Sequence, residues 1–125
     1  MTLQIVSFGC RYGAPGEADI VLDLRCLQNP YWVPELRDFS GRDEAIENYV
    51  YRDADARAFF DAIVAVVRLQ AQLARKKGKN TLRIACGCTG GHHRSVATAE
   101  RLARLFRAEG VPVEVYHRDL ERPLD

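Results

Sequence analysis

Apolar and polar residues repeat along this chain with two periods, one typical of strands and the other typical of helices. Short apolar runs bounded by Gly, Pro, Asp or Asn predict four strands, at residues 3–8, 18–24, 81–88 and 111–119. Apolar residues spaced three or four apart predict three helices, at residues 41–51, 53–80 and 95–110. The second helix has the clearest apolar stripe, made of Phe59, Phe60, Ile63, Val64, Val67 and Leu73.

The order of these elements predicts the fold class. Helices that alternate with strands indicate an α/β domain with a sheet that is at least partly parallel. We expect a single three-layer domain over residues 1–125, with about four strands and flanking helices. The unit from residue 82 to residue 117 is a strand, a turn, a helix and a strand, and it is expected to cross over with a right hand.

Residues 28–41 do not fit a helix or a strand. This segment, QNPYWVPELRDFSG, is rich in Pro and aromatic residues. We expect a long ordered loop, and long ordered loops in compact domains often carry function. Tyr31 and Trp32 lie in it, and they either stack on a ligand or fix the loop to the core.

Composition narrows the class of protein. With 47% hydrophobic and 28% charged residues, the chain is typical of a soluble globular protein. Its net charge of +1 argues neither for nor against nucleic acid as a partner. The sequence shows neither a signal peptide nor an apolar run of membrane-spanning length. We therefore expect a cytoplasmic protein without a membrane partner.

The chain has four cysteines, Cys10, Cys26, Cys86 and Cys88. They do not form paired CxxC motifs, so reduced thiols are the simplest interpretation. Cys86 and Cys88 precede two histidines, but the spacing is poor for zinc. We expect no metal and no cofactor.

The segment CGCTGGHHRS, residues 86–95, joins the third predicted strand to the third predicted helix. Gly90 and Gly91 lack the Cβ atoms that would keep backbone amides from converging on one anion. The N-terminus of the following helix directs free N–H groups at the same point. Arg94 adds a permanently charged fork of donors, and Thr89 and Ser95 add hydroxyls. The segment predicts a phosphate-like anion site, the alternative being a glycine-rich turn beside a capped helix.

A catalytic use of this loop stays open. Cys88, Arg94 and Ser95 follow the pattern C-x5-R-S, which resembles the phosphate loop of cysteine-dependent phosphatases. A Cys88 thiolate at a helix N-terminus would attack phosphorus, and Arg94 would hold the phosphoryl oxygens. The pattern does not identify the Asp that would protonate the leaving group, although Asp23 and Asp119 are candidates. A small buried residue at a strand end is the other interpretation of Cys88, and we expect no turnover.

Several longer motifs resemble one known family. The segment GCTGGHHRSV at residues 87–96 is similar to the GCTGG-x-HRSV signature of the C-terminal domain of the RapZ family of bacterial RNase adapters. SFGCRYG at 7–13, the stretch from 18 to 46, and HRDLE at 117–121 resemble further motifs of that domain, in the same order. The resemblance covers almost the whole chain.

The resemblance implies a regulatory domain that senses an amino-sugar phosphate, glucosamine 6-phosphate. It implies ligand binding by Thr89, Gly90 and Arg94, within the wider set Cys88, Thr89, Gly90, Gly91, His92, His93, Arg94 and Ser95. It implies a supporting pocket of Ser7, Gly9, Arg11, Asp23, Arg25, Asn29, Tyr31, His117 and Arg118. The family's P-loop kinase-like domain and its basic tail have no counterpart in this sequence, so ATP binding is not expected.

A partner beyond the small molecule stays open, whether a protein, an RNA or a second copy of the chain. Arg101, Arg104 and Arg107 lie three residues apart and could form a basic helix face for RNA phosphates. Glu100 and Glu109 interrupt this face, which favours an ordinary solvated surface.

Overall fold

The computed structural model describes residues 1–124 and contains one sheet of four strands. The strands are β1 (Thr2–Gly9), β2 (Ile20–Asp23), β3 (Thr81–Cys88) and β4 (Val113–His117). The helices are α1 (Glu44–Val50), α2 (Ala54–Lys76) and α3 (Arg94–Ala108), with 3-10 turns η1 (Cys10–Tyr12) and η2 (Pro30–Trp32). The strand order is β2-β3-β1-β4, and every pairing is parallel. The predicted α/β class is confirmed.

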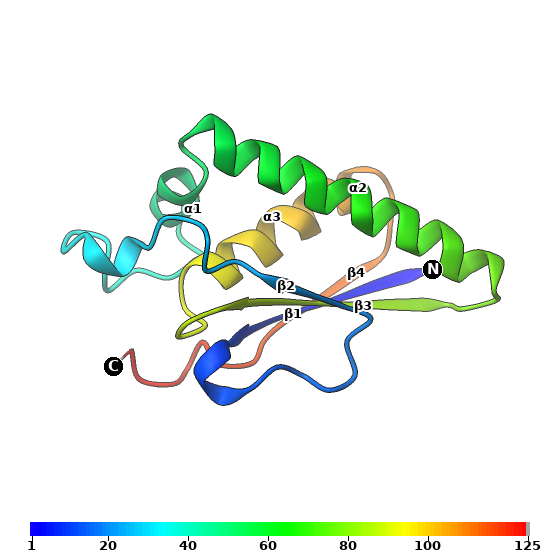
Figure 1. The fold of residues 1–125 in the computed structure, drawn as a ribbon, viewed down its shortest axis with the longest axis horizontal. Coiled ribbons are helices and arrows are strands. Elements are labelled where there is room, and N and C mark those ends of the chain that lie inside the picture. Colours follow the sequence, from blue (N-terminus) through cyan, green and yellow to red (C-terminus); the bar gives the residue numbers. More distant parts are fainter. Residues whose placement is uncertain (125) are drawn as a thin grey trace.

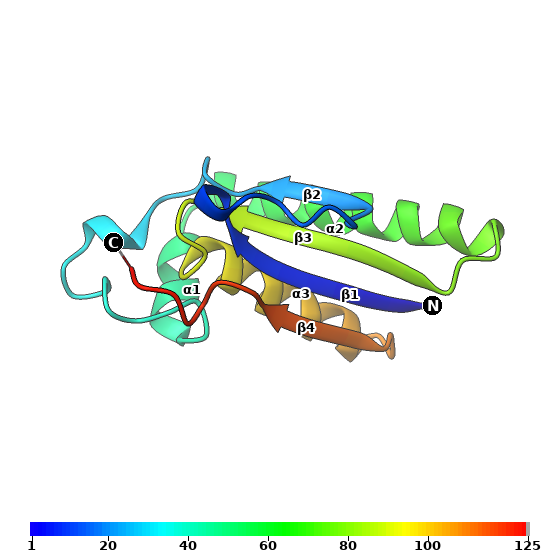
Figure 2. The same cartoon turned by 90° about the horizontal axis from the view of Figure 1, so that it is seen from below.

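All three helices lie on one face of the sheet, so the regular elements form two layers where three were expected (Figures 1 and 2). The topology explains this. The connections β2 to β3 and β3 to β4 both cross the sheet in the same direction, so right-handed crossovers place α1, α2 and α3 on one side. The connection from β1 to β2 runs in the opposite direction and passes over the other face. It contains η1 and residues 13–19, but no α-helix.

The core fills the space between the sheet and the helices. Leu3 and Ile5 of β1 alternate with half-exposed residues, as a strand covered on one face requires. The same core cluster includes apolar residues from the neighbouring strand and from the helices, namely Leu82, Ile84, Phe60, Ile63, Val67 and Leu102.

The predicted stripe of the second helix is correct except at its end. Leu73 is 57% exposed and does not belong to the core face of α2. Each helical residue turns by about 100°, so the six steps from Val67 to Leu73 carry its side chain about 120° away from the buried direction. The helix begins as predicted, because the Asp53 side chain accepts a hydrogen bond from the Ala56 amide at 2.8 Å.

The segment expected to be a long loop is irregular except for η2. The Asn29 side chain accepts a hydrogen bond from the Tyr31 amide at 3.1 Å, which caps this short turn. Within residues 1–124, no helix is both long enough and apolar enough to cross a membrane. The ends of β1, β2 and β3 and the start of α3 meet at the carboxyl edge of the sheet, where ligands of parallel α/β sheets bind.

Candidate functional site

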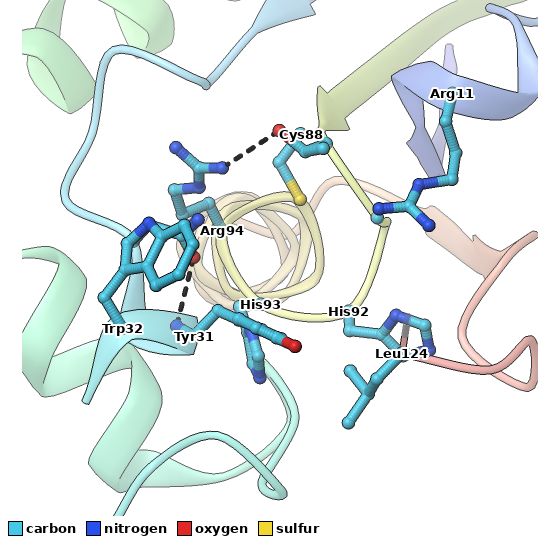
Figure 3. Close-up of a pocket in the computed structure, with 11 residues that line it drawn as sticks. Arg11, Tyr31, Trp32, Cys88, His92, His93, Arg94 and Leu124 are labelled. Carbon is cyan, nitrogen blue, oxygen red and sulfur yellow. Dashed lines mark hydrogen bonds between the residues drawn. The ribbon is translucent and has the colours of Figure 1, made fainter. Parts of the chain in front are cut away.

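A cavity of about 280 Å³ lies at this carboxyl edge (Figure 3). Its walls come from η1, η2, the loop between β3 and α3, and the C-terminal segment. The lining residues are Arg11, Asn29, Tyr31, Trp32, Cys88, Thr89, Gly90, His92, His93, Arg94 and Leu124. The structure thus brings most of the predicted ligand-binding residues to one cavity, although they come from distant parts of the chain.

The backbone amides of residues 90–94 have no hydrogen-bond acceptor within residues 1–124. They precede and open α3, a helix of 15 residues, so the positive end of its dipole lies beside them. Ser95, one residue further on, donates its amide to the Cys88 sulfur at 3.3 Å. The loop therefore keeps a run of free donors at the helix N-terminus, which is what an anion site needs.

Two glycines shape the loop in different ways. Gly91 has a φ of 81°, and a Cβ placed on it would lie 2.7 Å from the Gly9 nitrogen, so only glycine lets the loop pack on the end of β1. A Cβ on Gly90 would instead have the His92 Nδ1 atom, at 3.7 Å, as its nearest neighbour. Gly90 leaves space on the cavity side of the loop.

Arg94 is only 5% exposed, and hydrogen bonds hold its guanidinium in place. Its Nη1 atom donates to the carbonyl oxygens of Arg25 at 2.9 Å and Leu27 at 3.1 Å. Its Nη2 atom is 3.4 Å from the Thr89 hydroxyl, and its Nε atom has no acceptor within residues 1–124. No carboxylate in that part of the chain pairs with the guanidinium, so its charge is available to an anion.

Arg11 supplies a second cation. Its side chain is exposed, and Figure 3 shows it across the cavity from Arg94, with Cys88 between them. No Asp or Glu lines the cavity in the part of the chain that the structure describes. The cavity is therefore strongly electropositive.

Both histidines of the loop hold backbone segments through Nε2. His93 donates to the carbonyl oxygens of Arg37 at 3.0 Å and Phe39 at 2.7 Å, and His92 donates to that of Arg122 at 2.6 Å. Burial lowers the pKa of His93 below its ordinary value, so its ring is neutral and Nδ1 carries a lone pair. The Nδ1 atom of His92 is buried without a partner in residues 1–124. The His93 ring can therefore offer a ligand one nitrogen acceptor.

Cys88 lies at the cavity floor, 2% exposed, with Sγ 3.2 Å from the Ser95 hydroxyl. Figure 3 looks along α3 and shows this sulfur near the helix axis. Cys86, by contrast, is fully buried, and burial raises its pKa to about 12. Among residues 1–124, no three His, Cys, Asp or Glu side chains gather so as to hold a metal ion.

Neither predicted candidate for a general acid reaches the cavity. Asp23 pairs with Arg25 at 2.7 Å on the surface, and the hydrogen bonds from Arg25 lower the pKa of Asp23 to about 2. Asp119 pairs with Arg118 and Arg122, each at 2.8 Å. Both carboxylates are thus held as anions by arginines and cannot readily supply a proton.

Several predicted residues support the cavity without lining it. Gly91 belongs to the loop and packs on Gly9 at the end of β1, and Ser95 is fully buried in the first turn of α3. Six of the predicted supporting residues do not line the cavity. Their polar groups instead form hydrogen bonds with one another or with other parts of the chain. These are Ser7, Gly9, Asp23, Arg25, His117 and Arg118. Ser7 and His117, for example, form a partly buried chain with Glu100, with both contacts at 2.7 Å.

Sequence reasoning missed Leu124 and Gly41. Leu124 lines the cavity, although no pattern in the sequence marks it. The Gly41 amide donates to the His92 carbonyl at 2.8 Å, and a Cβ on Gly41 would meet the Ala97 nitrogen and the His93 oxygen. Its position beside Ser40 after an aromatic loop was a turn signal, but only the tertiary structure shows what the turn touches.

The predicted basic face of α3 is largely engaged within the chain. Arg101 and Arg104 both donate to Glu47, at 3.1 Å and 2.5 Å. Arg107 donates to the Val113 carbonyl at 2.9 Å. These contacts reduce the positive charge that the helix presents to solvent, and RNA binding through this face stays a prediction.

Residues 1–121 match the family model of the RapZ C-terminal domain. A nucleotide-binding protein of Streptomyces avermitilis is 50% identical over 118 residues, which make up 94% of this chain and 40% of the relative. A nucleotide-binding protein of Thermobifida fusca is 48% identical over 119 residues, or 95% of this chain and 40% of the relative. One of Frankia alni is 49% identical over 122 residues. The chain spans 40–42% of the length of these relatives.

Proposed function

Because this chain belongs to the RapZ C-terminal domain family, we propose that its cavity binds a phosphorylated small molecule in a regulatory role. The ligand class is an amino-sugar phosphate of the glucosamine 6-phosphate type. One observation carries the proposal: the free amides of residues 90–94 lie beside a buried arginine that no carboxylate of residues 1–124 neutralises. A phosphate dianion supplies the acceptors and the charge that this arrangement lacks.

The cavity is suited to a ligand of sugar-phosphate size. Its volume of about 280 Å³ lies at the lower end of the range for small-molecule sites, which is roughly 300–1,000 Å³. Trp32 is 74% exposed, so it does not fix the loop to the core and can stack on a sugar ring. Tyr31 lies beside it, with ring centroids 5.3 Å apart.

The amino group would be recognised by neutral acceptors, because no carboxylate lines the cavity among residues 1–124. The Nδ1 atom of His93 can accept from an ammonium or a hydroxyl, since Nε2 is already committed as a donor. Specificity for an amino sugar over a plain sugar thus depends on hydrogen bonds. The amino sugar itself is proposed because of the resemblance to the RapZ family.

The relatives are described as nucleotide-binding proteins, and that description applies to chains more than twice as long as the matched region. A nucleotide phosphate could use the same free amides. The cavity is small for a nucleotide, and we therefore propose that it prefers the sugar phosphate and that nucleotides bind more weakly.

Isothermal titration calorimetry tests the proposal with four ligands: glucosamine 6-phosphate, glucose 6-phosphate, glucosamine and ATP. We expect the first to bind most tightly and glucosamine to give no measurable heat. Arg11→Ala should weaken binding of the phosphates about tenfold without loss of stability, because the Arg11 side chain makes no hydrogen bond within residues 1–124. Arg75→Ala, an exposed arginine at the end of α2 far from the cavity, is the matched control. Equal heats for glucosamine and its phosphate would reject the anion site.

A cysteine phosphatase is the second candidate, and the Ser95 contacts with Cys88 are the observation in its favour. No Asp or Glu of residues 1–124 lines the cavity, so that part of the chain offers the leaving group no carboxylic acid as a proton donor, which argues against turnover. Hydrolysis of an aryl phosphate distinguishes a phosphatase from a binding module. The aryl alcohol is a good leaving group, so its departure does not need a proton from a general acid. We expect no hydrolysis above background, whereas turnover that Cys88→Ser abolishes would establish the enzyme.

A further inference from the structure

The sheet has an open edge at β4. Within residues 1–124 the strand order ends with β4, and Figure 2 shows no other strand beyond it. The Arg118 amide donates to the Ser7 carbonyl of β1 at 3.0 Å. Alternate residues of a parallel strand point to the same neighbour, so the even-numbered residues of β4 face β1. The N–H and C=O groups of Val113, Val115 and His117 therefore point away from the sheet.

Most of these outward backbone groups have no hydrogen-bond partner. Arg107 Nη2 donates to the Val113 carbonyl at 2.9 Å. The outward N–H and C=O groups of Val115 and His117 form no hydrogen bond within residues 1–124. Unpaired backbone groups along a sheet edge are a template for another extended chain. The edge is therefore suited to a segment of polypeptide rather than to a small molecule.

A second cavity, of about 290 Å³, lies beside this edge on the face of the sheet that the helices leave open. Val6 of β1 and Tyr116 of β4 give it apolar surface, and Tyr116 is 64% exposed. Pro15, from the connection between β1 and β2, lines the second cavity as well. Because Tyr116 belongs to both the edge strand and the second cavity, a long side chain on a segment paired with β4 can enter this cavity.

The charges around the second cavity are mainly negative. Glu17 and Glu114 line it, both are exposed, and neither forms an ion pair within residues 1–124. Gln4 donates to Glu114 at 2.9 Å and accepts from Arg83 Nε at 3.0 Å. Arg83 is the only cation that lines this cavity in the described part of the chain. Two carboxylates against one guanidinium favour a basic side chain, and the Tyr116 ring offers it an aromatic face.

We propose that β4 is a docking strand for an extended segment of a partner protein that carries arginine or lysine at alternate positions. The segment pairs with the outward groups of Val115 and His117 as a fifth strand. Its basic side chains lie on the open face of the sheet, with their aliphatic stems on Tyr116 and their charges near Glu114 and Glu17. The second cavity shares no lining residue with the anion cavity, so this inference is independent of the proposed ligand.

An NMR titration of the chain with a capped hexapeptide of alternating valine and arginine tests the docking strand. We expect millimolar binding, with the largest amide shifts at Val113, Val115 and His117. A peptide with glutamate in place of arginine should bind at least about tenfold more weakly, because its charges repel Glu114 and Glu17. The valine–arginine peptide N-methylated along its backbone should also bind at least about tenfold more weakly, because it cannot donate to the strand.

Two substitutions in the chain separate the backbone contact from the charge contact. Val115→Pro removes one outward N–H and keeps the pairing with β1, because edge strands accept proline where the N–H faces outward. We expect it to raise the dissociation constant about fivefold. Glu114→Lys should raise the constant about tenfold. Asp61→Lys is the matched control, since Asp61 is an exposed acid on α2, on the other side of the sheet, and its replacement should change nothing.

The amide spectrum of each variant shows directly whether it is folded. Absence of any shift up to about 5 mM peptide would overturn the proposal. Equal binding of the arginine and glutamate peptides would do the same, as would folded Val115→Pro and Glu114→Lys variants that bind as tightly as the unchanged chain. Shifts at β4 that follow the protein concentration without peptide would assign the edge to a second copy of the chain and would also contradict it.

Discussion

The carboxylate of Asp119 accepts a hydrogen bond from the backbone amide of Gly9 at 2.7 Å. Asp119 is fully buried, and it also binds Arg118 and Arg122. The contact joins the segment after β4 to the end of β1, directly beneath Gly91, whose added Cβ would lie 3.1 Å from that of Asp119. The loop between β3 and α3 therefore rests on a contact made by a residue outside it.

Replacing Asp119 should destabilise the whole domain. Asp119→Ala leaves the Gly9 amide and two guanidinium groups without their buried acceptor, and we expect a loss of about 3–5 kcal/mol in the free energy of unfolding. Asp23→Ala is the control, since its pair with Arg25 is solvent-exposed and should contribute less than about 1 kcal/mol. Urea unfolding measures both. A similar small loss for the two variants would show that Asp119 is not an anchor.

The two loop glycines should respond differently to alanine. Gly91→Ala forces a side chain into a left-handed conformation and against the Gly9 nitrogen, so we expect a loss of about 2–4 kcal/mol of stability. Gly90→Ala meets no close atom and should stay within about 1 kcal/mol of the unchanged chain. Its methyl group would occupy the cavity side of the loop and weaken phosphate binding. Denaturant unfolding and calorimetry on both variants separate the packing role from the binding role.

His93 should make stability depend on pH. Burial lowers its pKa in the folded state, so between the folded value and the unfolded value near 6.5 the unfolded chain binds more protons. The free energy of unfolding is then constant above about pH 7 and falls as the pH decreases through 6, by up to about 1.4 kcal/mol per pH unit. His93→Gln keeps a donor for the Arg37 and Phe39 carbonyls and should flatten this dependence. Urea unfolding at pH 7.5, 6.5 and 5.5 measures it, and an unchanged slope in the variant would assign the effect to another group.

RNA binding should be weak and only slightly dependent on salt. Because Arg101 and Arg104 bind Glu47, few arginines of α3 are free to meet phosphates. We expect a plot of log affinity against log salt with a slope shallower than about −2, since each phosphate contact contributes about −0.7 to −0.9. Gel shifts with a short single-stranded RNA from 50 to 200 mM salt provide the measurement. A slope of about −4 or steeper would support an RNA-binding face.

The structure of the loop between β3 and α3 could be predicted from local sequence because its parts are contiguous. The apolar run of β3, Gly90 and Gly91, and the start of α3 at Arg94 follow one another within a single segment, and each has a local physical reason. The same locality explains why the strand bounds of β3 were predicted without error.

Other features depend on tertiary contacts that a single segment does not encode. Leu124 reaches the cavity only because Asp119 and His92 hold the C-terminal segment in place. Leu73 fits an apolar spacing on either side of α2, and only packing against the sheet decides which side is buried. The two layers follow from the strand order, which a list of elements does not contain.

Two arginines and no acid line the cavity among residues 1–124, and this imbalance of charge affects how the protein behaves in buffers. We expect the cavity to bind small anions from the buffer, so sulfate, inorganic phosphate or citrate should compete with the proposed ligand. Bound buffer anions should raise the melting temperature by mass action, and they should lower the apparent affinity measured for the proposed ligand. Titrations carried out in chloride or acetate alone will come closest to the true affinity.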